Sequence, residues 1–386
     1  MKIIFLTILL VSSLFAQTQA EYEQEQKSAF ASYKHKQEVG FQQYKKNYLD
    51  AIKKYKKDLK YFWNDPKISN KKEWLLYTKD KKTRSDVDFS KETITIQTIA
   101  SSKKEAKQKL RKALAEVVTV DTKYVQDNDP LEKVLSHIKK PSTLIDKDVS
   151  SEPILSTIIF DKKPTKKSVR TYVNKHIVKD KIKARRVKNK NFIIYSVAIK
   201  MPNNATIKRS KIYYNEVKKQ ASRQNLPIEL VFAIMHSESS FNPRARSYIP
   251  AYGLMQLVPR TAGLDAYQYL YHKRRLVSGR YLYDSKNNIK MGVAYLHILY
   301  YRYLRKIKNK KSRIYCTIAA YNTGAGNIAY AFTKTHNMNR AAPIINRLTA
   351  DEVYARLLLD LKYDEPKQYL KKVSKRMILY KKIYAM

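Results

Sequence analysis

The stretch Leu230–Pro243 reads LVFAIMHSESSFNP, and its apolar residues recur at helical spacing. One helix face carries positions i, i+3, i+4 and i+7, which are Val231, Ile234, Met235 and Glu238. A carboxylate therefore lies on an apolar stripe. Burial there raises its pKa, and the negative end of the helix dipole acts in the same direction. A carboxyl group that keeps its proton can act as a general acid. The alternative is that Glu238 turns to solvent as the helix ends.

The residues around this stretch predict a mainly helical C-terminal region. A helix is expected over Ser210–Gln224, and Asn225-Leu226-Pro227 ends it. Pro227 suits the first position of the helix that follows. Asp284 or Ser285 can cap a long helix that continues through Tyr300. The pattern changes near residue 205, where we place a domain boundary.

The N-terminal half predicts an α+β module. Apolar and aromatic residues at steps of three and four predict a long amphipathic helix, or two, between Phe30 and Phe62. Alternation predicts short strands at Val87–Phe89 and Ile94–Ile96. A capping box, Ser102 to Glu105, predicts the start of a helix.

Residues 150–200 look rich in strands, and Ile154–Phe160 and Phe192–Ile199 are the clearest of them. The fold class is therefore α+β, with an N-terminal α+β domain followed by a mainly helical one. A chain of 386 residues is long enough for two such domains.

The first residues resemble a secretory signal. Met1-Lys2 is positive, Ile3–Ala16 is apolar, and cleavage is expected near Ala16 or Ala20, so residues 1–20 form the predicted signal peptide. An uncleaved anchor is the alternative. The single cysteine is Cys316, so neither an intrachain disulfide nor lipid attachment at an N-terminal cysteine is expected.

The net charge of +45 is spread over both halves of the chain. Nucleic-acid binders usually concentrate charge on one face, so we expect no nucleic-acid partner. A lysine-rich solvated surface is the simpler explanation. The charge still favours contact with acidic polymers or an anionic membrane surface.

Six of the seven glycines lie between Gly253 and Gly326, which indicates a site rather than linkers. Their aromatic and amide neighbours suit a sugar, because tyrosine rings stack on pyranose faces and amides bind hydroxyl groups. No Lys-Ser/Thr pair follows Gly324 and Gly326, so a phosphate loop is excluded. The histidines have no metal-ligand spacing, and no metal or cofactor is expected.

Three blocks together resemble the soluble-lytic-transglycosylase family, which has a lysozyme-like fold. They are Glu238–Pro243 (ESSFNP), Tyr252–Pro259 (YGLMQLVP) and Ala320–Gly326 (AYNTGAG), in the family's order and spacing. Residues 77–100 resemble the accessory domain of one membrane-bound branch. The resemblance implies an accessory domain at 21–204 and a transglycosylase domain at 205–386. That branch is anchored to the outer membrane by a lipid, which this chain has no N-terminal cysteine to carry.

By matching position, the resemblance implies that Glu238 is the catalytic acid and base. It also implies a set of substrate-binding residues: Ser247, Tyr252, Gln256, Tyr321, Asn322, Glu365 and Tyr369. The implied partner is a peptidoglycan glycan strand, and the implied location is the periplasm, with association with the outer membrane left open.

The acids near these blocks suit a reaction with one carboxylate. Between Glu238 and Tyr321 the other acids are Asp265 and Asp284, and Asp284 is better explained as a helix cap. Glu238 would protonate the glycosidic oxygen and then, as carboxylate, take the proton of the muramoyl 6-hydroxyl, closing a 1,6-anhydro ring. A hydrolase of the same fold, using Asp265 or a water near Ser247, is one alternative. A non-catalytic wall-binding scaffold is another.

Overall fold

The computed structural model describes residues 39–40, 42–141, 144–160, 162–187, 190–248 and 250–384. The chain divides into two compact units, residues 1–55 with 134–143, and residues 56–133 with 144–386. Residues 42–60 are helical, which confirms the later part of the predicted Phe30–Phe62 helix. Residues 30–38 of that helix and the predicted signal peptide lie outside the described residues.

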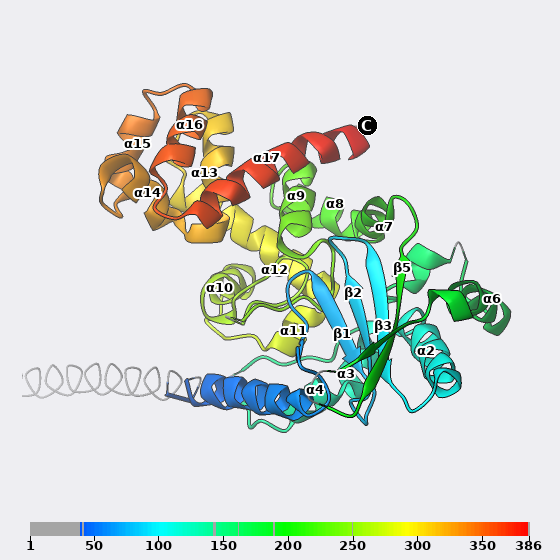
Figure 1. Cartoon of the computed structure of the whole chain (residues 1–386). Helices are drawn as coiled ribbons and strands as arrows, with labels where there is room; N and C mark the ends of the chain where they lie inside the picture. Colours follow the sequence, from blue (N-terminus) through cyan, green and yellow to red (C-terminus); the bar gives the residue numbers. More distant parts are fainter. Residues whose placement is uncertain are drawn as a thin grey trace, which may run out of the picture. The chain divides into compact units, whose positions relative to one another are not determined.

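An antiparallel sheet of five strands organises the first part of the larger unit (Figure 1). Its spatial order is β1 (Glu73–Tyr77), β2 (Thr83–Asp88), β3 (Thr93–Ile99), β5 (Ile193–Lys200) and β4 (Lys183–Arg186). The strands predicted at Ile94–Ile96 and Phe192–Ile199 are confirmed as β3 and β5. The strand predicted at Val87–Phe89 is the end of β2, which begins earlier and stops before Phe89. β1 was not predicted, because its sequence EWLLY is an apolar run without alternation.

One face of the sheet packs against helix α2 (Lys103–Val117), as Figure 1 shows. Trp74, Val87 and Ile94 lie on this face and are almost completely buried. Ser102 caps α2 by accepting a hydrogen bond from the backbone N–H of Glu105. The Glu105 carboxylate accepts from Ser101 instead of Ser102, so the predicted capping box is only half formed.

The predicted strand at Ile154–Phe160 is wrong. Residues Ser156–Ile159 form the short helix α5, and Ile154, Leu155 and Ile158 are buried in the core. A short apolar run is compatible with a buried helix as well as with a buried strand, and periodicity cannot separate the two. Residues 150–200 also contain helix α6 (Lys166–His176), which Thr165 caps, so this region is less rich in strands than expected.

Helices dominate after residue 205. The predicted helix Ser210–Gln224 is two helices, α7 (Ala205–Ile212) and α8 (Tyr214–Arg223), which meet at the buried Tyr213. Neither glycine nor proline marks this break in the sequence. Helix α9 spans Ile228–Ser239, so Pro227 is its N-cap and not its first helical residue.

The predicted cap at Asp284 is confirmed, because its carboxylate accepts from the backbone N–H of Asn287 at the start of α12 (Ser285–His297). A π-helical segment, Ile298–Tyr303, follows α12 directly. The long C-terminal helix α17 (Asp364–Tyr384) packs along α9 (Figure 1). The remaining helices are α3 (Thr122–Asn128), α4 (Pro130–Ser136), α10 (Leu264–Tyr271), α11 (Gly279–Tyr283), α13 (Lys310–Thr323), α14 (Ala325–Thr333), α15 (Met338–Ile345) and α16 (Ala350–Asp360).

The α+β class with a mainly helical second part is confirmed. In the described part of the chain, none of the helices combines the length and the apolar composition that a membrane span requires.

Candidate active site

Glu238 lies in the last turn of α9 and is 6% exposed, so the alternative in which it turns to solvent is wrong. Burial raises the pKa of its carboxyl group, as the sequence predicts. Lys71, Tyr369 and Lys72 oppose this rise, and Glu365 adds to it. The raised pKa therefore reflects burial that the surrounding groups only partly offset.

The chain turns sharply after α9. Ser240 and Phe241 both adopt left-handed backbone conformations, with φ of 51° and 61°. Such conformations are unfavourable for a residue with a side chain, so surrounding contacts must hold them. Phe241 is buried and stacks near Tyr213, with ring centroids 6.4 Å apart.

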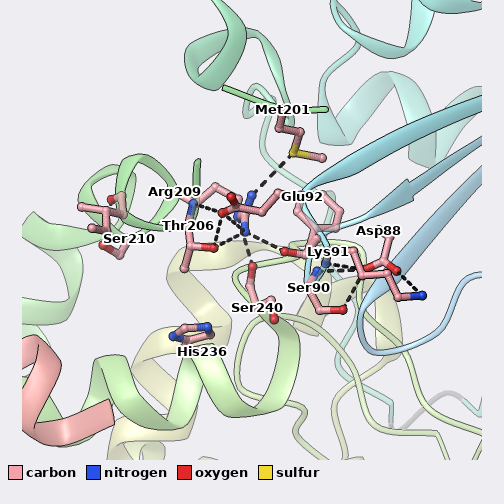
Figure 2. A network of polar contacts seen from close by, with 12 residues as sticks. Asp88, Ser90, Lys91, Glu92, Met201, Thr206, Arg209, Ser210, His236 and Ser240 are labelled. Carbon is pink, nitrogen blue, oxygen red and sulfur yellow. Dashed lines mark hydrogen bonds and ion pairs between the residues drawn. The ribbon is translucent and has the colours of Figure 1, made fainter. Parts of the chain in front are cut away.

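Arg209 on α7 ties this turn to the sheet, as Figure 2 shows. Its guanidinium donates to the Ser240 carbonyl at 3.1 Å and to the Phe89 carbonyl at 2.9 Å. Glu92, 3.8 Å away, supplies the nearest negative charge. Burial lowers the pKa of Arg209 to about 10, so the side chain stays charged at neutral pH. The end of α9 is thus fixed from the β2–β3 hairpin.

Two lysines that precede β1 also reach the end of α9. The Lys72 ammonium donates to the carbonyls of His236 and Ser237 at 3.0 and 2.7 Å. The Lys71 Nζ lies 3.9 Å from Oε2 of Glu238. Burial, followed by the charge of Arg376, lowers the pKa of Lys72 to about 7. Neither lysine was predicted from the sequence, because nothing distinguishes them among 78 basic residues.

Two tyrosines from different helices accompany Glu238. The Tyr321 hydroxyl, on α13, donates to the Met255 carbonyl at 2.8 Å. Tyr369, on α17, is 8% exposed. Burial raises the pKa of both phenols well above the ordinary value, and the charge of Glu238 adds to this rise. Both groups therefore stay protonated and can act as hydrogen-bond donors.

The loop between Ala251 and Val258 is held by the buried Asn288 of α12. Its amide donates to the carbonyls of Tyr252 and Leu282, each at 2.8 Å, and its oxygen accepts from the Met255 N–H. Gly253 has φ of +73°, and a Cβ there would lie 2.4 Å from the Asn288 amide nitrogen and the Leu282 carbonyl. This position therefore requires glycine.

The side chains of this loop have different environments. Gln256 donates to the Gly253 carbonyl at 3.0 Å, while its own side-chain oxygen is buried without a hydrogen-bond partner. The Tyr252 ring packs edge-on against Tyr283, with centroids 5.4 Å apart, and is 4% exposed. The side chain of Tyr252 is therefore part of the packing, whereas Gln256 keeps an unused acceptor.

The other predicted residues are distributed over a turn and two helices. The Ser247 hydroxyl accepts from the Ala251 N–H at 3.1 Å and closes the turn before the loop. The amide of Asn322, at the end of α13, lies 3.5 Å from the carboxylate of Glu365 on α17. The structure therefore gathers Glu238, Tyr321, Tyr369 and Glu365 into one electrostatic cluster, with Asn322 at its edge.

Comparison with known proteins gives two family matches. Residues 41–212 match the family described as membrane-bound lytic murein transglycosylase C, N-terminal domain, and residues 215–343 match the transglycosylase SLT domain. Two proteins named membrane-bound lytic murein transglycosylase C are similar over 83% of this chain and 85% of their own length. The protein from Serratia proteamaculans is 35% identical, and the one from Klebsiella pneumoniae is 33% identical.

Among solved structures, the 70 kDa soluble lytic transglycosylase from Escherichia coli matches 44% of this chain and 24% of its own length. It is 24% identical, with a TM-score of 0.35. The extent of the match to the curated relatives identifies the family. The chain therefore belongs to the membrane-bound lytic murein transglycosylase C family of peptidoglycan lytic transglycosylases.

Proposed function

We propose that this enzyme cleaves the β-1,4 bond between N-acetylmuramic acid and N-acetylglucosamine without water and leaves a 1,6-anhydromuramoyl end. The observation that carries the proposal is the buried Glu238 with its raised pKa. Protonated Glu238 donates to the glycosidic oxygen. The resulting carboxylate then takes the proton of the muramoyl 6-hydroxyl, which attacks C1 and closes the ring, so one group serves both steps.

The surroundings of the other carboxylates support a reaction that depends on Glu238 alone. A glycosidase that uses two carboxylates places them on either side of the scissile bond. Asp284 caps α12, and Asp265 accepts a hydrogen bond from Tyr303 at 3.3 Å. Glu365 is exposed, and its charge raises the pKa of Glu238. Its role in the proposal is to hold substrate and to keep Glu238 protonated.

The remaining candidate residues hold the sugar in this proposal. Gln256 offers its unpaired side-chain oxygen, Asn322 its amide and Tyr369 its phenol donor. The Tyr321 O–H already donates to the Met255 carbonyl, so its hydroxyl oxygen can only accept. Ser247 and Tyr252 act by shaping the turn and loop that carry Gln256, since the Tyr252 ring is buried. Residues 21–204 then serve as the accessory domain and residues 205–386 as the catalytic domain.

The proposal also places the enzyme at the cell wall. The apolar segment after Lys2 suits export to the periplasm, and the net charge of +45 suits contact with anionic polymers or an anionic membrane surface. The members of the family to which this chain is similar are named membrane-bound. Association with the outer membrane is therefore part of the proposal.

Mass spectrometry of peptidoglycan digested by the purified protein tests the reaction. We expect anhydromuropeptides as the main products. Ordinary reducing ends would instead support the hydrolase alternative. Binding to peptidoglycan without release of fragments would support the scaffold alternative.

A further inference from the structure

A turn at Asn70 presents Lys71 and Lys72 to the end of α9. The Asn70 side-chain oxygen accepts from the backbone N–H groups of Lys72 and Glu73 at 2.8 and 2.9 Å. The Lys72 carbonyl accepts from the Phe89 N–H at 2.9 Å, which extends the pairing of β1 with β2. The Asn70 carbonyl accepts from the Arg246 N–H at 3.4 Å. The backbone of this turn is thus fixed both by the sheet and by the segment that leads to Ser247.

Lys72 binds the last turn of the helix that carries Glu238. Its two hydrogen bonds, to the His236 and Ser237 carbonyls, satisfy backbone acceptors at the end of α9. When Lys72 is protonated, its charge also interacts favourably with the helix dipole, and its pKa of about 7 makes this part of the interaction weaken above neutral pH. Because Glu238 follows Ser237 directly, these bonds fix the position of its backbone.

Lys71 faces the carboxylate itself. Its Nζ lies 3.9 Å from Oε2 of Glu238, a distance beyond a direct hydrogen bond but within an ion pair. The Lys71 side chain is 41% exposed, whereas that of Glu238 is 8% exposed. A solvated cation at this distance leaves the protonated acid accessible, yet it supplies a counter-charge once the proton has been donated.

We infer that Lys71 and Lys72, contributed by the sheet module, are positioning residues of the active site. Lys72 holds the last turn of α9, and Lys71 stabilises Glu238 as a carboxylate after proton donation. The inference rests on the proposed role of Glu238. It gives residues 70–73 a part in the chemistry of a site otherwise built from helices, loops and turns after residue 205.

The pH dependence of activity distinguishes this role from a merely structural one. The groups that act on Glu238 are Lys71 and Lys72 before β1, Tyr321 on α13, and Tyr369 and Glu365 on α17. Lys71 lowers the pKa of Glu238, so its removal raises that pKa. The fall of kcat/KM at high pH, where Glu238 loses its proton, must then move to higher pH in Lys71→Met.

The experiment compares Lys71→Met with the wild type on soluble glycan strands across the pH range. We expect the alkaline limb of the kcat/KM profile to shift to higher pH. We also expect kcat to fall about fivefold, which is the effect of one charge at about 4 Å in a solvated setting. Lys91→Met is the matched control, because the exposed Lys91 pairs with a different carboxylate, that of the buried Asp88 at 3.3 Å. It changes the net charge equally and should leave the profile unchanged.

Lys72 is tested in parallel. Lys72→Met removes the donor to the Ser237 carbonyl and one of the two donors to the His236 carbonyl, which still accepts from the Ser240 N–H. We expect a fall in kcat and a smaller change in KM. Lys72→Arg, which keeps a charged donor, should recover most of the loss. Melting temperatures of all variants separate loss of folding from loss of positioning.

The outcomes separate this inference from the proposed function. A Lys71→Met profile that superimposes on that of the wild type, together with an inactive Glu238→Gln variant, overturns the inference and leaves the proposed function intact. If Glu238→Gln keeps its activity, the proposed function itself fails.

Discussion

Two glutamates are buried to the same degree but have different partners. Glu132 is 7% exposed and Glu238 is 6% exposed. The Arg244 guanidinium lies 2.9 Å from the Glu132 carboxylate, Arg246 lies 3.9 Å from it, and Gln126 donates to it at 3.3 Å. Among the residues that the structure describes, the ion-pair partner of Glu238 is the half-exposed Lys71 at 3.9 Å.

This difference separates a paired structural carboxylate from the one that we propose as the catalytic acid. A buried charge is tolerated when it is paired and hydrogen-bonded, and Glu132 satisfies both conditions. Glu238 is under-compensated, so burial raises its pKa and favours its protonated form. Burial alone therefore does not distinguish these two glutamates, whereas the distance to the nearest cation does.

The largest expected effect is on activity at Glu238. Glu238→Gln removes the only proton donor of the proposed reaction, and general acid–base catalysis contributes about 10²- to 10⁴-fold. Because one group serves two steps, we expect release of soluble fragments from peptidoglycan to fall by at least about 1,000-fold. Glu229→Gln, at the other end of α9, is the control and should stay within about twofold of the wild type.

The reverse pattern is expected at Glu132. Glu132→Gln removes the carboxylate that pairs with the buried Arg244 at 2.9 Å, and breaking a buried pair in this way costs about 3–5 kcal/mol. Denaturant unfolding should therefore detect a large loss of stability. The activity of the fraction that remains folded should stay near that of the wild type. A loss of activity as large as that of Glu238→Gln would contradict the structural role of Glu132.

The pH dependence of stability sharpens the contrast. The folded-state pKa of Glu238 lies above its ordinary value of 4.5, so between these two values the folded state binds more protons than the unfolded state. Stability therefore falls as pH rises through this window. The Glu238→Gln variant does not lose stability in this way, because glutamine does not titrate. Its stability should match that of the wild type most closely below pH 4.5, exceed it increasingly as pH rises through this window, and keep a constant advantage above the folded-state pKa.

Asp129 makes the stability of the wild type and of Glu238→Gln fall with rising pH in the same way. Burial raises its pKa from 3.8 to about 6, so its contribution cancels in the difference between Glu238→Gln and the wild type. The measurement is the unfolding free energy of both proteins from pH 3 to 8. A difference that does not change with pH would contradict the raised pKa of Glu238.

The smallest expected effect is at Glu365. Its charge raises the pKa of Glu238, so Glu365→Gln should move the alkaline limb of kcat/KM to slightly lower pH. This shift is opposite in sign to that expected for Lys71→Met. The pH profile of kcat/KM checks it, and an upward shift would show that Glu365 acts in some other way.

Local signals allowed much of the fold to be predicted. The cap at Asp284, the alternation in β2 and β3 and the apolar stripe of α9 depend on neighbouring residues. The strand expected at Ile154–Phe160 failed because an apolar run fixes burial but not backbone conformation. The break at Tyr213 has no local signal, since tertiary packing holds it.

In the candidate site, too, local features could be predicted from the sequence and long-range contacts could not. The position of Glu238 on an apolar stripe predicted its burial and its raised pKa. Lys72 contacts carbonyls more than 160 residues away in the chain, and no pattern near Lys71 or Lys72 indicates such a contact. Long-range pairs of this kind depend on how the sheet and α9 pack together.

Digestion of peptidoglycan in H₂¹⁸O tests the central claim most directly. We predict 1,6-anhydromuropeptides without ¹⁸O, because the muramoyl 6-hydroxyl replaces water as the nucleophile. Glu238 donates a proton to the glycosidic oxygen and then accepts the proton of that hydroxyl. Muramoyl reducing ends that carry ¹⁸O as the primary product would contradict it.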